Sequence, residues 1–221
     1  MQPLDYPGPR IGAAGVLEAD GAWTELGAGQ PLPGALTAGR TCVVAVGSNG
    51  SPPRLHAKLD AAGVADRVAM VPCEVSGVGI AHSAHVSVAG YVATTPYALA
   101  DSRVRVVASW FSAEQLAAVD ATERNYTRQR LPDAGRRAPD GAQAYVSWRG
   151  VLAPGGVVLA ATTQARVHEA LARDPVLAEM LPLGDPAATV AALRERVTAT
   201  AVRERLREAG WVLPTGLGGF P

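Results

Sequence analysis

The chain has 221 residues, of which 48% are hydrophobic, so it can form one ordinary domain or two small ones with a real core. Twenty basic and twenty acidic side chains cancel, which argues against a dedicated nucleic-acid-binding or membrane-surface protein. No apolar run reaches the roughly 18 residues that a bilayer-spanning helix needs. The first ten residues lack the pattern of a secretory signal, and the only cysteines are Cys42 and Cys73. We therefore expect a cytoplasmic protein without a disulfide framework.

Residues 1–39 form a lead segment that is rich in glycine and proline and has no clear hydrophobic period. Because these residues favour turns, only a short hairpin over 15–26 is expected there. Regular structure begins with the apolar run 42–46, which predicts a short buried strand. The turn formers Gly47-Ser48-Asn49-Gly50 follow it directly.

A helix is predicted immediately after this turn. Ser51 is a residue type favoured at a helix N-cap, and Pro52 suits the first helical position. Leu55 and Leu59 are four residues apart and therefore share one face. Gly63 is expected to end the helix, so this part of the chain reads as strand, tight turn and helix.

Further elements are expected along the rest of the chain. Ser112 and Gln115 form a capping-box pattern that opens a helix with Leu116 and Val119 on one face. Strands are predicted over 67–71, over 85–91 with Thr94-Thr95-Pro96 closing it, and over 104–110, and a hairpin pairs 144–152 with 157–160 around Pro154-Gly155-Gly156. Residues 132–141 are expected to form a loop, 163–172 a helix, and Asp185-Pro186 opens a last long helix that ends at Gly210.

These elements mix helices and strands without regular βαβ alternation. They predict an α+β fold with a mixed, curved, partly closed β-sheet or barrel and flanking helices. Three successive segments are expected, namely the lead segment 1–39, a core over 40–160, and a C-terminal helical extension over 161–221 that packs on the core.

The glycine-rich turn at 47–50 is the first candidate site. Such a turn directs several backbone N–H groups one way, and the following helix dipole adds partial positive charge, so it can hold a carboxylate or phosphate. The Lys-Ser/Thr pair of a P-loop and the three-glycine spacing of a Rossmann turn are absent. A turn that is purely structural is the competing interpretation, since strand-to-helix turns often contain Gly, Ser and Asn.

Glu123 is the second candidate. It falls near the C-terminal end of the helix predicted from Ser112, where the dipole disfavours a carboxylate ion, so a buried Glu123 would suit a general base near neutral pH. The positive charges of Arg124 and Arg128 would instead favour the carboxylate ion, so the sequence leaves the net effect on Glu123 open. A solvated acidic helix end is the competing interpretation.

Taken together, the two motifs resemble those of the γ-glutamyl cyclotransferase-like superfamily. The entry motif of that family is an aromatic residue followed by Gly-Ser-Asn, matched here at Gly47-Ser48-Asn49. Its later motif is a Leu-Asp-x-x-Glu-Gly run with a Tyr and often an Arg close behind. The matching run here is Leu116-x-x-Val119-Asp120-x-x-Glu123-x-x-Tyr126-x-Arg128. The resemblance covers residues 41–152, about half of the chain.

The resemblance implies a cyclotransferase-like core at 40–160 and an enzyme without metal or organic cofactor. It implies that Glu123 is the catalytic general acid/base, which takes a proton from the α-ammonium of a γ-glutamyl group. The freed amine then attacks the γ-carbonyl of the same molecule, and 5-oxoproline and an amine are released. The amino-acid end of the substrate would be held by Val46, Gly47, Ser48, Asn49 and Gly50, with Tyr126 as a pocket wall.

Two residues depart from the family pattern, Val46 in place of Tyr and Arg124 in place of Gly. The substrate therefore stays open among glutathione, γ-glutamyl amino acids, γ-glutamyl amines and acyl-protected antibiotic intermediates. The competing functions are a non-catalytic small-molecule-binding or partner-recruiting module on the same fold, and a related amide lyase or transferase that uses the same carboxylate. No nucleic-acid or membrane partner is expected. The segments 1–39 and 161–221 could each be a lid, a homodimer arm or an extension without a role, and the sequence leaves these alternatives open.

Other chemistry-bearing residues give weaker signals. His82 and His85 form an H-x-x-H pattern downstream of Cys73, but zinc needs three or four ligands and this spacing suits a helix better than a strand, so no metal site is predicted. A contact of His85 with substrate stays open. Ser48 lacks the G-x-S-x-G pattern of a serine hydrolase. The alternating Arg and Glu residues of the last helix are typical of a solvated face.

Overall fold

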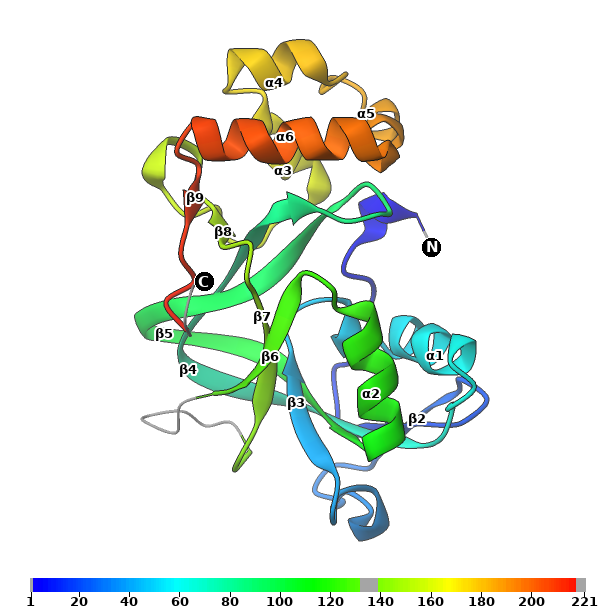
Figure 1. Ribbon diagram of the computed structural model, residues 1–221. Helices are drawn as coiled ribbons and strands as arrows, with labels where there is room; N and C mark the ends of the chain where they lie inside the picture. Colours follow the sequence, from blue (N-terminus) through cyan, green and yellow to red (C-terminus); the bar gives the residue numbers. More distant parts are fainter. Residues whose placement is uncertain (1, 132–138, 218–221) are drawn as a thin grey trace. The chain divides into compact units, whose positions relative to one another are not determined.

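The computed structural model describes residues 2–131 and 139–217 (Figure 1). Among these residues the strands are β1 (Gly15–Leu17), β2 (Trp23–Glu25), β3 (Thr41–Ala45), β4 (Val68–Val86), β5 (Val92–Phe111), β6 (Tyr126–Arg130), β7 (Gln143–Ser147), β8 (Val151–Leu152) and β9 (Val212–Leu213). The α-helices are α1 (Pro52–Ala61), α2 (Ala113–Thr122), α3 (Gln164–Leu171), α4 (Pro175–Met180), α5 (Pro186–Arg194) and α6 (Arg196–Glu208). Within the described ranges, no helix is both long enough and apolar enough to cross a membrane.

The strands form one mixed sheet in the order β2-β1-β4-β5-β3-β7-β6, with β8 paired to β4 and β9 paired to β8. Most neighbours are antiparallel, whereas β3 and β7 are parallel, with Val43 opposite Gln143. The expected α+β class and mixed sheet are confirmed. The expected partial closure into a barrel is wrong, because in the described strands the short end strands β2 and β6 each have a neighbour on one side only.

Contacts divide the chain into two interleaved compact units. The sheet unit comprises Gly8–Gly79 and Ala98–Val146, and the helical unit comprises Met1–Pro7, Ile80–Tyr97 and Ser147–Pro221. Two of the boundaries, between Gly79 and Ile80 and between Tyr97 and Ala98, fall inside long strands. Strands β4 and β5 therefore each contribute residues to both units. These units are not successive in the chain, and the segments 1–39, 40–160 and 161–221 stay a prediction about domains.

The core of the sheet unit lies between the sheet and two helices. Helices α1 and α2 lie side by side (Figure 1). Leu55 and Leu59 of α1 are fully buried, as their four-residue spacing predicts, and Val119 of α2 joins them. The strands contribute Val43 and Phe111 to the same cluster. This packing holds α1, which follows the Gly-Ser-Asn turn, and α2, which precedes Glu123.

The helical unit has its own core. Leu171, Leu177 and Leu193, from α3, α4 and α5, are buried together with residues of α6. Val92 of β5 and Leu152 of β8 belong to the same cluster, so the C-terminal helices pack against residues of the 40–160 segment.

Several local predictions are confirmed. Residues 15–26 form the β1–β2 hairpin, and the apolar run 42–46 lies almost wholly in β3. The side chain of Ser112 accepts from the Gln115 amide and the Gln115 side chain accepts from the Ser112 amide, which is the predicted capping box at α2. Gly63 follows α1 with a φ of 69°, a conformation that favours glycine.

The predicted strand at 85–91 is wrong. Strand β4 continues from Val68 to Val86, and the chain then turns, with the Tyr91 carbonyl accepting from the Ser87 amide. Gly90 lies in this turn at a φ of 82°, where its glycine is needed because a Cβ would lie 2.4 Å from a carbonyl oxygen. Thr94-Thr95-Pro96 lies inside β5 and does not end a strand.

Two predictions for the second half of the chain are also wrong. Residues 157–160 form no described strand beyond a single bridge between Ala81 and Ala160, and β8 pairs with β4 and β9 instead. The last long helix is two helices, because Glu195 has an extended backbone between α5 and α6. Of the loop expected at 132–141, residues 132–138 lie outside the described part of the chain.

Candidate functional site

The Gly-Ser-Asn turn joins β3 to α1 within the sheet unit. Residues 48–50 form one turn of 3-10 helix, in which the Gly50 amide donates to the Gly47 carbonyl and the Ser51 amide to the Ser48 carbonyl. A Cβ at Gly50 would lie 3.3 Å from Val107, so this position is closely packed. Since the amides of Gly50 and Ser51 are used within the turn, those of Ser48 and Asn49 are the remaining candidate donors to a bound anion.

Glu123 lies at the C-terminal end of α2, as the sequence predicts. It is the C-cap residue, with its amide bonded to the Asp120 carbonyl and its carbonyl accepting from the Tyr126 amide. Helices α1 and α2 are neighbours, and Glu123 at the end of α2 reaches Asn49 in the turn that precedes α1. Only 14% of the Glu123 side chain is exposed, so it is not a solvated helix end.

The structure brings Asn49 and Glu123 into direct contact. The Asn49 side-chain amide nitrogen donates to Glu123 Oε1 over 3.1 Å, across a separation of 74 residues. Asn49 is itself 8% exposed. The two motifs that the sequence singles out therefore meet at one place in the sheet unit.

Lys58 completes this cluster, and sequence reasoning missed it. Its ammonium nitrogen lies 2.7 Å from Glu123 Oε1 and 2.7 Å from Asn49 Oδ1, and 22% of its side chain is exposed. Lys58 is the only lysine among twenty basic residues. That single exception to the use of arginine was the signal available in the sequence. Asn49, Lys58 and Glu123 are called the Asn–Lys–Glu cluster below.

Two residues at the start of α1 carry buried polar atoms without partners. Ser51 is the N-cap by its backbone, but its Oγ makes no hydrogen bond to the described residues. Nε and Nη2 of Arg54 are also buried and unpaired within the described part of the chain. Unpaired buried donors are costly, so these atoms are candidate donors to a bound ligand.

The carboxylate of Asp120 fixes the segment that carries Glu123. Arg128 of β6 holds it with two hydrogen bonds, of 2.8 and 3.0 Å, and the Tyr145 hydroxyl donates to it over 2.7 Å. The hydrogen bond from Arg128 is the main cause that lowers the pKa of Asp120. Burial, followed by the hydrogen bond to Asp120 and the charges of Asp120 and Glu123, raises the pKa of Tyr145, so its hydroxyl stays protonated.

The remaining predicted site residues lie close by along the chain. The Val46 side chain is buried, and its carbonyl accepts from Nη2 of Arg10 over 3.0 Å. Tyr126 is half-buried and packs against the core cluster of the sheet unit. Its role as a pocket wall, and those of Val46, Gly47, Ser48 and Gly50 in substrate binding, stay predictions.

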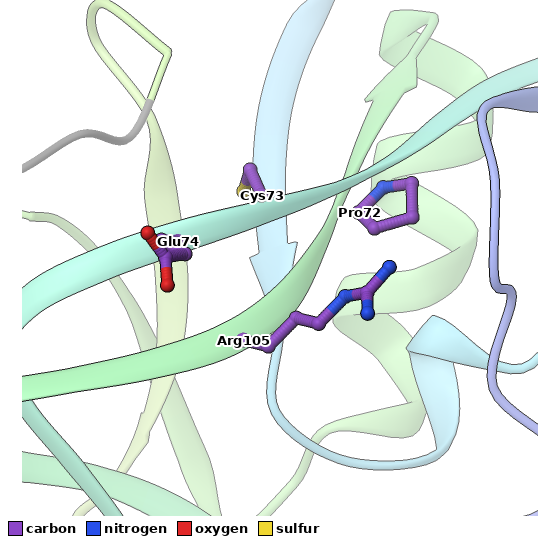
Figure 2. Close-up of a pocket in the computed structure, with 4 residues that line it drawn as sticks. All are labelled: Pro72, Cys73, Glu74 and Arg105. Carbon is purple, nitrogen blue, oxygen red and sulfur yellow. The ribbon is translucent and has the colours of Figure 1, made fainter. Parts of the chain in front are cut away.

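A cavity of about 370 Å³ in the sheet unit is lined by none of the predicted site residues. Its lining residues are Pro72, Cys73 and Glu74 of β4 and Arg105 of β5 (Figure 2). Burial raises the pKa of Cys73, and burial followed by the neighbouring Cys73 raises that of Cys42 to about 12. Both thiols are therefore protonated near neutral pH and are poor nucleophiles.

The histidines of the H-x-x-H pattern are engaged by neighbouring groups. His82 Nδ1 lies 3.1 Å from the Val92 carbonyl and its Nε2 lies 3.2 Å from the Thr162 carbonyl. The Ser83 hydroxyl lies 2.6 Å from His85 Nδ1. No group of three or more His, Cys, Asp or Glu side chains suited to a metal ion occurs among the residues described.

Neither a scan against models of protein families nor a search of curated proteins gave a match for this chain.

Proposed function

We propose that the protein is a γ-glutamyl cyclotransferase-like enzyme with the fold of that superfamily, and that it releases 5-oxoproline and an amine from a γ-glutamyl amide. The observation that supports this most is the 3.1 Å hydrogen bond between Asn49 and Glu123. It joins the two motifs on which the family resemblance rests, although 74 residues separate them.

The geometry suits intramolecular aminolysis. The substrate α-carboxylate would bind the amides of Ser48 and Asn49 at the N-terminal end of α1. Ser51 and Arg54, at the start of that helix, carry side-chain atoms that have no partner among the described residues. Glu123 takes a proton from the α-ammonium, and the nitrogen lone pair attacks the γ-carbonyl carbon. The attacking nitrogen loses its second proton as the bond from that carbon to the leaving nitrogen breaks. The leaving nitrogen takes up this proton and the one held by Glu123, so the product amine departs as an ammonium ion and the carboxylate is restored. No cofactor is needed, because the attack occurs within one molecule.

A non-catalytic module on the same fold, which binds a small molecule or recruits a partner, is the second candidate. The salt bridge from Lys58 favours it, because an ammonium already occupies one oxygen of Glu123. The departures at Val46 and Arg124 point the same way. A related amide lyase or transferase would use the same carboxylate.

The proposal includes a cytoplasmic enzyme that acts on a small molecule and has no nucleic-acid or membrane partner. The residues of the Asn–Lys–Glu cluster all belong to one chain, so the cluster does not need a second copy. In a homodimer, each copy would carry a complete site of its own.

The test is incubation of the purified protein with a panel of γ-glutamyl amino acids, γ-glutamyl amines and glutathione. Mass spectrometry measures 5-oxoproline against a blank without protein, since some of these compounds cyclise unaided. Release above the blank from at least one compound is expected. No release from any compound, together with a rise in thermal stability on adding one of them, would contradict the enzyme and favour the binding module.

A further inference from the structure

The two oxygens of the Glu123 carboxylate have different surroundings. Oε1 accepts two hydrogen bonds, from the Asn49 side chain at 3.1 Å and from the Lys58 ammonium at 2.7 Å. No group in the described part of the chain hydrogen-bonds Oε2. As far as the described residues go, the carboxylate is therefore held through Oε1 alone.

Lys58 also fixes the orientation of Asn49. Its ammonium donates to Asn49 Oδ1, which turns the amide nitrogen of the same side chain toward Glu123. The three side chains thus form a closed ring of hydrogen bonds in which each orients the next. Lys58 itself projects from α1, whose Leu55 and Leu59 are anchored in the core, so the ammonium is supported by a rigid element.

A general base needs one oxygen with a free lone pair that faces the proton it removes. An ammonium on the other oxygen restrains the rotation of the carboxylate. Removing that ammonium would leave the Asn49 amide as the one remaining hydrogen-bond donor to the carboxylate among the described residues, and would loosen it.

We propose that Lys58 is a positioning residue that holds Oε1 of Glu123, so that Oε2 is the atom that exchanges a proton with the substrate amine. This inference rests on the proposed function for the identity of the amine. It assigns a role to a residue outside the Gly-Ser-Asn and acidic motifs. It also assigns different roles to the two carboxylate oxygens.

The single lysine makes a direct test possible. Incorporation of ¹³C- and ¹⁵N-labelled lysine gives one side-chain signal from this chain, which NMR can follow through a pH titration. We expect that signal to shift as Glu123 becomes protonated, and to lose this transition in Glu123→Gln. Glu18→Gln is the matched control, because Glu18 pairs with Arg67 elsewhere in the sheet unit. A Lys58 signal that is indifferent to Glu123→Gln would overturn the proposal, whatever the activity.

Kinetics on the compound that the panel identifies form the second arm. Lys58→Met should lower kcat roughly 10- to 100-fold with little change in KM. Lys58→Arg should restore part of the rate, since a guanidinium can still donate to Oε1. Asp60→Asn, at an exposed position of the same helix, should leave the rate unchanged.

The two arms separate the two proposals. A Lys58→Met protein with the wild-type kcat would overturn the positioning role while leaving Glu123 as the acid/base. Absence of turnover by the wild-type protein would contradict the proposed function, and with it the catalytic part of this role. The NMR titration would then still decide whether Lys58 holds the carboxylate.

Discussion

At the scale of single residues, Asp120 supports the predicted site although no proton transfer is assigned to it. Its carboxylate joins α2 to Arg128 of β6 and to Tyr145 of β7. Glu123 follows three residues later, so the position of its backbone depends on these contacts. A Tyr hydroxyl that stays protonated is a reliable donor in such a network.

Tyr145→Phe removes one hydrogen bond from this network and keeps the buried ring. We expect a loss of about 1 kcal/mol in the free energy of unfolding, because Asp120 keeps both bonds to Arg128. Urea denaturation measures this loss. Tyr97→Phe is the control and should be close to neutral, and a Tyr145→Phe protein as stable as the wild type would show that the hydroxyl contributes nothing.

The sequence identified Glu123 and Asn49 because both lie in local patterns, a capped helix with an acidic end and a strand–turn–helix junction. It did not identify Lys58, Ser51 or Arg54 as site residues. Lys58 matters only because α1 packs beside α2, and no local pattern encodes that packing. Its status as the only lysine was visible in the sequence but carried no indication of its partner.

At the scale of elements, α4 shows how one side chain can begin a short helix and anchor it. Asp174 accepts from the Leu177 amide at the N-cap, and Arg205 of α6 holds the same carboxylate with bonds as short as 2.7 Å. These contacts, the hydrogen bond from Arg205 first, lower the pKa of Asp174.

Asp174→Ala should lower the free energy of unfolding by about 1–2 kcal/mol through loss of the cap. The loss should be larger than this because the ion pair with Arg205 is removed as well. Asp174→Asn keeps a capping oxygen and should cost less. Because the pKa of the folded state is lowered, the ionic contribution is present above the unfolded pKa of about 4 and is lost as pH falls through the folded value. The gap between the wild type and Asp174→Asn, measured by urea denaturation, should therefore narrow between pH 7 and pH 3; a gap that widens would contradict this.

The elements with terminal signals are those that the sequence predicts well. Ser112 with Gln115, Gly63 and Gly210 mark helix ends that the structure confirms. The break at Glu195 has no Gly or Pro to mark it. The length of β4 could not be predicted because the strand contains Pro72 and two glycines, residue types that usually mark the end of a strand.

At the scale of the whole molecule, three buried histidines link stability to pH. Burial lowers the pKa of His82 and His168, and burial together with the charges of Arg149 and Arg203 lowers that of His85 to about 3. In the unfolded chain these groups titrate near 6.5. The unfolded state therefore binds more protons below that pH, and the folded state loses stability as pH falls.

Each such histidine should make the free energy of unfolding fall as the pH drops below about 6.5, because the unfolded chain takes up a proton that the folded chain does not. His168→Leu tests this, because neither ring nitrogen of His168 has a hydrogen-bond partner among the described residues. We expect the variant to show a shallower decline of unfolding free energy between pH 6 and pH 4.5. An unchanged slope would mean that His168 is protonated in the folded protein.

The most direct measurement is the rate of 5-oxoproline release by the wild-type and Glu123→Gln proteins with the same γ-glutamyl compound. Glutamine keeps the size of the side chain but cannot take up the proton, so kcat/KM should fall roughly 10²- to 10⁴-fold while urea unfolding shows a folded protein. A folded Glu123→Gln protein with the wild-type kcat/KM would show that Glu123 is not the acid/base.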